Sequence, residues 1–401
     1  MLILNIFLFC AGLLLLIKGG DWFVDSASGI ARRFKLPELL IGATVVSIGT
    51  TLPEVMVSAQ GAMAGSGAMA YGNAIGSIIC NTSLIAAITI AIKPGKVERK
   101  SMILPVSFFF GAAVFYSIIA YATKKFDRWA GIVLLVGFVI YMTITVLSMV
   151  KKPKVSISEE DLARSSPKTE DKDEEKESAW TFSVKGYIIE LLIAAAGGAL
   201  MIYKGIAGKG NPVIMYLGIA MMSVFAAYSV VALVCGIAKK KIPAICRDIM
   251  FIAVGAGVIA GGANLLVDSG IFIANKVGVP ETVISLTFVA LGTSLPELVT
   301  AITSLIKGKG ALSLGNIIGA NLFNLVLVSG VATVISPFAV PADSTIGNIN
   351  SSFVLDIPLM FAVMALMIVP TLIRGKLSRW QGIVLLCLYA GFCVMQFAVV
   401  H

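Results

Sequence analysis

The hexapeptide Gly49-Thr50-Thr51-Leu52-Pro53-Glu54 recurs almost unchanged 243 residues later, as Gly292-Thr293-Ser294-Leu295-Pro296-Glu297. The same offset pairs residues on both sides of the hexapeptide: Asp25 with Asp268, Pro37 with Pro280, Asn73 with Asn316, Gly76 with Gly319 and Asn81 with Asn324. Near the C-terminal end the offset grows to 251 and pairs Trp129 with Trp380, which indicates that one loop of the second half is eight residues longer. A register held over this length is not a chance match, and it predicts two homologous halves.

The composition places the chain in a membrane. Of its 401 residues, 58% are hydrophobic and only 13% are charged, which excludes a soluble globular domain. Apolar runs long enough to cross a hydrocarbon layer of about 30 Å recur along the chain, whereas alternating strand-like segments do not. We therefore predict an all-α polytopic membrane protein. The first apolar run lacks a cleavage-like site and is interpreted as a retained first helix.

The predicted spans form two groups of five with two further spans between them, about twelve in total. Their ranges are 2–24, 37–62, 71–92, 101–122 and 129–150, then 188–203 and 213–238, then 245–267, 280–306, 311–335, 352–372 and 380–400. The second group starts seven crossings after the first, and an odd number reverses its direction, so the five-helix repeats are predicted to be inverted. The expected domains are a first repeat over 1–150, a charged linker over 151–179, two additional helices over 180–241 and a second repeat over 242–401.

The basic residues predict the topology. The net charge is +9, but Lys and Arg lie in short loops between apolar runs, which argues against nucleic-acid binding. Most of these loops fall on one side if the N-terminus is outside. We therefore expect a multi-pass protein of the cell membrane whose N-terminus is outside and whose linker, 151–179, is cytoplasmic.

The repeated hexapeptides predict a cation site. Each lies inside an apolar span, where proline removes a backbone donor and is expected to leave carbonyls near Ser47 and Ala290 without partners. The adjacent Glu54 and Glu297 supply formal charge, and an ionised glutamate in a membrane needs a compensating cation or proton. Ca²⁺ prefers six to eight oxygen ligands, so carbonyls and carboxylates together suit it. The nearby hydroxyls, which singly would be ordinary helix hydrogen bonds, are added as ligands: Thr50, Thr51, Thr293 and Ser294.

A second matched pair, 72–81 and 315–324, adds amide groups. Ser77 and Asn81 are four residues apart and share a helical face, and Asn324 occupies the place of Asn81 in the other half. Such asparagines often only join helices, but two carboxylates nearby favour a role as ligands. Four other acidic residues lie near span ends and are interpreted as interfacial or capping groups outside the site: Asp25, Glu190, Asp268 and Asp356.

These motifs resemble those of the calcium/cation antiporter superfamily, and within it the prokaryotic sodium/calcium exchangers. The resemblance covers 2–150 and 245–400 and implies one cluster of ion sites where the two halves meet. It implies that Glu54 and Glu297 are the Ca²⁺ carboxylates, that Thr50 and Thr293 donate carbonyls, and that the ring is completed by Ser77, Asn81 and Asn324 with help from Thr51 and Ser294. The chain departs from the family pattern at two places. Ala320 stands where the first half has Ser77, and both Asn81 and Asn324 are asparagine where many family members have an Asp at one of the two positions, so only two carboxylates remain.

The hypothesis is an antiporter that exchanges Ca²⁺ for Na⁺ by alternating access at the site shared by Glu54 and Glu297. The resemblance implies that the first span of each repeat, 2–24 and 245–267, slides over the core. Gly19-Gly20 and Gly261-Gly262 are candidate flexible points in these two spans. An H⁺/Ca²⁺ antiporter and, from another class, a cation-selective channel stay open as alternatives. No enzyme activity and no cofactor are expected, because the chain has a single histidine and no GxSxG motif. The expected partners are Ca²⁺, monovalent cations and the lipid bilayer, and the sequence leaves the oligomeric state open.

Overall fold

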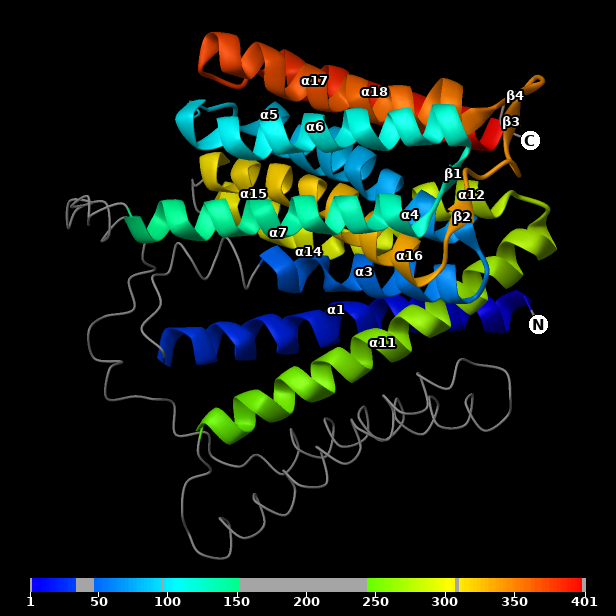
Figure 1. The fold of residues 1–401 in the computed structure, drawn as a ribbon, viewed down its shortest axis with the longest axis horizontal. Helices are drawn as coiled ribbons and strands as arrows, with labels where there is room; N and C mark the ends of the chain where they lie inside the picture. Colours follow the sequence, from blue (N-terminus) through cyan, green and yellow to red (C-terminus); the bar gives the residue numbers. More distant parts are fainter. Residues whose placement is uncertain are drawn as a thin grey trace, which may run out of the picture.

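The computed structural model describes residues 2–33, 47–95, 97, 99–151, 244–306 and 310–398, and most of these lie in helices (Figure 1). The helices of the first half are α1 (Leu2–Arg33), α3 (Ser47–Met63), α4 (Gly67–Cys80) continued by η2 (Asn81–Ala86) and α5 (Ala87–Ile92), α6 (Arg99–Thr123) and α7 (Arg128–Lys151). The helices of the second half are α11 (Ala244–Val277), α12 (Glu281–Ile284), η3 (Ser285–Val289), α13 (Ala290–Thr293), α14 (Leu295–Ile306), α15 (Gly310–Phe323), η4 (Asn324–Val328), α16 (Ser329–Ile335), η5 (Ser352–Asp356), α17 (Ile357–Arg374) and α18 (Arg379–Ala398). The segments labelled η are π-helical turns within longer helices.

Two short antiparallel strand pairs lie in the loops. Strand β1 (Lys125–Phe126) pairs with β2 (Phe338–Ala339), and β3 (Thr345–Ile346) pairs with β4 (Ile349–Asn350). The first pair connects loops of the two halves.

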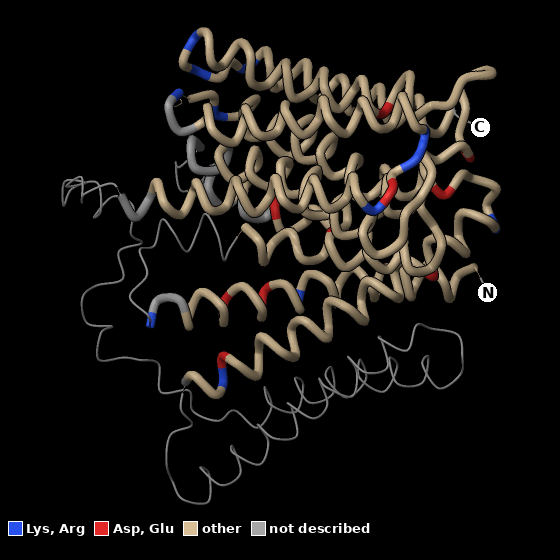
Figure 2. The backbone as a smooth tube through the Cα atoms, in the orientation of Figure 1, with Lys and Arg blue, Asp and Glu red and all other residues tan. Residues whose placement is uncertain are grey.

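The predicted all-α polytopic fold is confirmed. Within the described ranges, eight helices are long and apolar enough to cross a membrane. Lys and Arg lie mainly toward the ends of the helices, while a few isolated acidic positions lie deeper in the bundle (Figure 2). The two additional spans predicted within 180–241 and nearly all of the linker 151–179 fall outside the described residues, so these boundaries stay predictions.

Helices α1 and α11 run side by side in opposite directions (Figure 1). A β-carbon at Gly12 would lie 2.8 Å from the carbonyl oxygen of Gly262, and one at Gly19 would lie 2.8 Å from that of Gly255. The 243-residue offset matches Gly12 with Gly255 and Gly19 with Gly262, so the contact is reciprocal, as between elements related by a two-fold axis. This antiparallel pairing is what inverted halves predict.

That Gly19-Gly20 and Gly261-Gly262 are flexible points stays a prediction. Both α1 and α11 are continuous helices through these residues. At Gly19 and Gly262 the backbones of α1 and α11 touch, so a larger side chain at either position would push the two helices apart.

A second reciprocal contact joins the peripheral helices to the opposite half. A β-carbon at Gly131 of α7 would lie 2.9 Å from the Gly330 carbonyl oxygen of α16, and one at Gly382 of α18 would lie 2.7 Å from the Ala87 carbonyl oxygen of α5. Ala87 matches Gly330 at the offset of 243. The last helix of each half therefore packs against the other half: α7 contacts α16, and α18 contacts α5.

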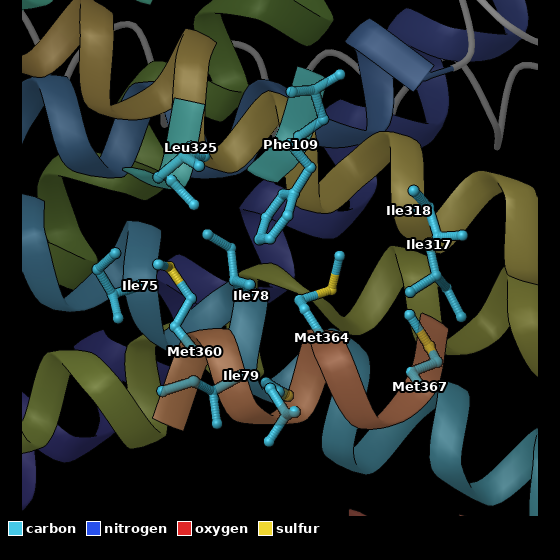
Figure 3. Close-up of a cluster of buried hydrophobic side chains, with 14 of the residues drawn as sticks. Ile75, Ile78, Ile79, Phe109, Ile317, Ile318, Leu325, Met360, Met364 and Met367 are labelled. Atoms are coloured by element: carbon cyan, nitrogen blue, oxygen red, sulfur yellow. The ribbon is translucent and has the colours of Figure 1, made fainter. Parts of the chain in front are cut away.

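The largest apolar cluster lies between α4, α6, α15, η4 and α17. Figure 3 shows methionines of α17 facing isoleucines of α4 and α15 across this core: Met360, Met364, Met367, Ile75, Ile78, Ile79, Ile317 and Ile318. Flexible thioether side chains fill the irregular space between helices that cross at different angles. This core fixes α4 and α15, which carry the second pair of motifs.

Candidate functional site

Glu54 lies on α3 one residue after Pro53 and is only 1% exposed. The described part of α3 remains helical on both sides of Pro53. The hydroxyl of Ser294 in the second half donates a hydrogen bond to Glu54 Oε1 over 3.4 Å. The acidic side chain of one motif is therefore in contact with the hydroxyl of the other.

Glu297 has the matching place in the second half, and here the helix does break. Helix α13 ends at Thr293, Ser294 leaves the helical region with φ −86° and ψ 7°, and α14 begins at Leu295. Glu297 lies in the first turn of α14, where the helix dipole favours a negative charge. Its carboxyl group is 1% exposed, faces the side chain of Thr50 and is close enough to Glu54 for the two acids to interact electrostatically.

The carbonyl groups beside the prolines are less open than the sequence predicts. The hydroxyl of Thr51 donates to the Ser47 carbonyl over 2.9 Å, and that of Thr50 does so over 3.3 Å. In the second half, the Ala290 carbonyl accepts from the Thr293 hydroxyl and from the Ser294 amide. Of the carbonyls expected to lack partners, near Ser47 to Thr50 and near Ala290 to Thr293, those of Ser47 and Ala290 therefore do have hydrogen-bond donors.

The amide ligands predicted from the second motif pair are buried beside the carboxylates. Asn81 and Asn324 are the first residues of the π-helical turns η2 and η4, and their side chains are at most 1% exposed. Ser77, one turn before Asn81 on α4, is fully buried. Turn η2 contacts α14, which carries Glu297, and η4 contacts α3, which carries Glu54. A π-helical turn widens the helix locally, and such turns are frequent at functional sites.

The buried oxygen atoms of these residues lack protein partners. The oxygen atoms are Glu54 Oε2, both carboxylate oxygens of Glu297, Ser77 Oγ, Asn81 Oδ1 and Asn324 Oδ1, and the amide nitrogens of the two asparagines are unpaired as well. Leaving a buried polar group unsatisfied costs about 1 to 3 kcal/mol, and buried charges cost more, so a cluster of this kind needs an outside partner.

The chemistry of these atoms fits a hard cation. The donor set is carboxylate, amide and hydroxyl oxygen, which Ca²⁺ and alkali cations prefer over the nitrogen and sulfur ligands of transition metals. Within the described part of the chain, no three His, Cys, Asp or Glu side chains are placed to hold a metal ion. Among the described residues predicted as ligands, Glu54 and Glu297 are the two that carry formal charge.

All nine residues predicted as ligands are buried in the structure, but they differ in their partners. Thr50, Thr51 and Thr293 donate to carbonyls of their own helices, and Ser294 donates to Glu54. The unpaired atoms belong to the other five: Glu54, Ser77, Asn81, Glu297 and Asn324. That any of the nine binds an ion stays a prediction.

Asn73 is a residue of this site that sequence reasoning left out. Its side-chain amide donates to the Glu54 carbonyl over 3.0 Å and to Ser58 Oγ over 2.8 Å, and its oxygen accepts from the Thr293 hydroxyl over 3.1 Å. Asn73 thus joins α3, α4 and α13. Its match with Asn316 at the common offset was a signal, but Asn316 is only partly buried, so the two halves differ here.

Glycines bring α4 close to the second half. A β-carbon at Gly72 would lie 2.6 Å from Ser285 Cβ, and one at Gly76 would lie 2.5 Å from the Leu286 carbonyl oxygen. The face of α4 that carries Gly72 and Gly76 is therefore packed directly on η3, and this contact positions Asn73 and Ser77 beside the second hexapeptide.

Comparison with known proteins identifies relatives along nearly the whole chain. The sequence profile described as "Sodium/calcium exchanger protein" matches residues 4–147 and 248–398. The sodium/calcium exchanger MaX1 of Methanosarcina acetivorans is 28% identical over 397 residues, which cover 99% of each chain. The inner membrane protein YrbG of Escherichia coli is 30% identical over 331 residues, which cover 82% of this chain and 79% of YrbG.

Solved structures are similar as well. The sodium-calcium exchanger NCX_Mj, in crystals soaked with 2.5 mM Na⁺ and 10 mM Sr²⁺, superposes with a TM-score of 0.52 and 25% identity and covers 97% of this chain and 98% of its own. The two stretches of the profile match lie in the two halves that share the hexapeptide and together span most of the chain. The chain therefore belongs to the sodium/calcium exchanger protein family.

Proposed function

We propose that this protein exchanges Ca²⁺ for Na⁺ across the cell membrane at one site shared by Glu54 and Glu297. The observation that carries the proposal is the set of buried, unpaired side-chain oxygen atoms on Glu54, Glu297 and residues of the elements that contact their helices in both halves. Membership of the sodium/calcium exchanger family, and the likeness to NCX_Mj and MaX1, support the choice of ions. Those relatives are described as exchangers, which agrees with a transporter rather than an enzyme.

The charge of the site explains why transport would be an exchange. Two carboxylates balance one Ca²⁺ or two monovalent cations, so the two kinds of ion compete for the same charge. An uncompensated glutamate inside the membrane costs at least about 2.5 kcal/mol on insertion scales, and two such groups would also repel each other. The empty site is thus unfavourable, and the loaded forms are the ones expected to change access.

Alternating access would use the reciprocal packing of the two halves. Ion ligands come from both halves, and inverted halves can exchange conformations so that the site opens first to one side and then to the other. Helices α1 and α11, which touch through their glycines, would move as one pair across the rest of the bundle.

The basic residues support an orientation with the N-terminus outside. Arg99 donates to the Ile373 carbonyl and Arg379 to the Ile92 carbonyl, so basic residues of both halves gather at one end. In Figure 1 the N-terminus lies at the opposite end. The basic end would face the cytoplasm, together with the charged linker.

The proposal is tested in proteoliposomes loaded with Na⁺ and diluted into Na⁺-free medium that contains Ca²⁺. Ca²⁺ uptake should require the outward Na⁺ gradient and should stop when the gradient is abolished. Uptake driven by a pH gradient without Na⁺ would instead identify an H⁺/Ca²⁺ antiporter. Flux that needs no counter-ion on the other side would identify a cation-selective channel and overturn the proposal.

A further inference from the structure

Asp356 is a buried acid that the proposed exchange site does not use. It ends the π-helical turn η5 and precedes α17, one turn into the apolar span Ser352–Arg374, and it is 0% exposed. At the offset of 251 its match in the first half is Pro105, so it is not part of the duplicated pattern. Among the described residues, no ion pair includes it.

The partner of Asp356 is a glutamine from the last helix. Gln396 of α18 is 1% exposed, and its Nε2 donates a hydrogen bond to Asp356 Oδ1 over 2.8 Å. The remaining oxygens of the same two groups, Asp356 Oδ2 and Gln396 Oε1, have no hydrogen-bond partner. The fully buried hydroxyls of Ser352 and Tyr71 also face this pair without a hydrogen bond of normal geometry.

The geometry points to a proton. A carboxylic acid and a primary amide form two hydrogen bonds at once when the acid carries its proton, because the amide N–H donates to one oxygen and the acid O–H donates to the amide oxygen. With the first of these bonds in place, a proton on Asp356 Oδ2 supplies the second. Without it, Asp356 Oδ2 and Gln396 Oε1, which have only lone pairs, would depend on the hydroxyls of Ser352 and Tyr71 for donors, and a carboxylate would be buried without a cation.

The surroundings of Asp356 offer no other compensating charge. The titratable groups that face it are Tyr71 of α4 and Asp343 of the loop before β3. Tyr116 and Tyr121 of α6 lie near Tyr71. None of these groups is basic, so within the described residues only a bound cation can neutralise the acid, and the proton is the one whose geometry the amide completes.

We propose that Asp356 and Gln396 form a proton-binding site, separate from the exchange site, in which Asp356 carries a proton shared with Gln396. The site takes one proton from water and returns it as pH rises. It joins α18 to the start of α17, whose Met360 packs against α4 in the core (Figure 3), and α4 carries Ser77. Loss of the proton would therefore loosen the helices that support the exchange site.

The test compares wild type with Asp356→Asn in the full-length protein. Asparagine replaces the O–H donor by an N–H donor, so both hydrogen bonds to Gln396 can form at every pH. The wild type should show the infrared C=O band of a buried protonated carboxylic acid, and its melting temperature should fall as pH rises into the alkaline range. The variant should fold, lack that band and lose this alkaline decline.

A matched control lies on the same helix. Gln381 of α18 is fully buried and donates to the Leu366 carbonyl and to Thr371, and its hydrogen bonds within the described ranges include no acid. Gln381→Leu should lower the melting temperature equally at all pH values and keep the infrared band, whereas Gln396→Leu should shift the band.

Two results would overturn the assignment. One is an infrared band and a pH dependence of melting that are the same in Asp356→Asn as in wild type. The other is stabilisation by added Na⁺ at constant pH that is lost in Asp356→Asn, because that would assign a metal cation to this carboxylate. Neither result depends on Ca²⁺ transport, so the proton site and the exchange function are tested separately.

Discussion

Ser294 of the second half donates its hydroxyl hydrogen bond to Glu54 of the first half, with 3.4 Å between Oγ and Oε1. Because this contact crosses between the halves, the proposed ion site depends on residues of both.

Removing either buried charge should strongly weaken exchange. Glu54→Gln and Glu297→Gln keep the shape of the side chain but lose half of the formal charge, so Ca²⁺ affinity should fall by about tenfold or more, since a hydrogen-bonded charge contributes roughly 1.5 to 3 kcal/mol. Na⁺-driven ⁴⁵Ca²⁺ uptake measures this. Asp127→Asn is the matched control, because Asp127 is exposed and paired with Lys125. Normal uptake in both glutamine variants would reject the site.

Asn73 should act by positioning the motifs. Asn73→Ala removes three buried hydrogen bonds that join α3, α4 and α13, and we expect a loss of stability of about 1 to 3 kcal/mol together with weaker Ca²⁺ binding. Thermal unfolding with and without Ca²⁺ measures both effects. The matched Asn316→Ala should cost less, since Asn316 is only partly buried. Equal effects of the two substitutions would contradict the assigned role.

Ser77 should matter for ions rather than for stability. Its buried hydroxyl has no protein partner, so Ser77→Ala removes an unsatisfied group and should leave the melting temperature of the ion-free protein nearly unchanged. The same change should weaken stabilisation by Ca²⁺ or Na⁺. Ser58→Ala is the control with the opposite pattern, because the Ser58 hydroxyl accepts from Asn73 and donates to the Ala70 carbonyl. Ser77→Ala with wild-type ion responses would remove Ser77 from the ligand set.

The glycine contact between α1 and α11 should tolerate no side chain. Gly262→Ala places a β-carbon 2.8 Å from the Gly12 carbonyl oxygen, and such overpacking typically costs about 1 to 3 kcal/mol. Gly137→Ala on α7 meets no atom within 4 Å, and there alanine should be neutral or stabilising by up to about 1 kcal/mol. Melting temperatures and uptake rates of the two variants decide the point. A harmless Gly262→Ala would show that the helices are not held in contact here.

Several features of the fold follow from the sequence because they depend on local chemistry. Apolar runs such as Gly67–Ile92 and Ser352–Arg374 predict helices in lipid, since a backbone without water must satisfy its own hydrogen bonds. The shared register of Glu54 with Glu297 predicts two related halves. The family resemblance rested on the same motifs and is confirmed.

Other features were decided by tertiary packing. The backbones of α1 and α11 touch at Gly19 and Gly262, which the resemblance offered only as candidate flexible points. Asn73 and Asp356 gained importance from neighbours that are distant in the chain, Thr293 and Gln396.

The physical reason is that some properties depend on residues close together in the chain, whereas others depend on contacts between distant segments. Hydrophobic length, proline chemistry and repeat register are properties of a segment, so the amino-acid sequence alone determined the helices, the duplicated motifs and the residue types of the proposed cation site. Which buried oxygen atoms stay unpaired, and which helices meet at a glycine, depends on contacts between segments some 200 residues apart, and only the tertiary structure decided those.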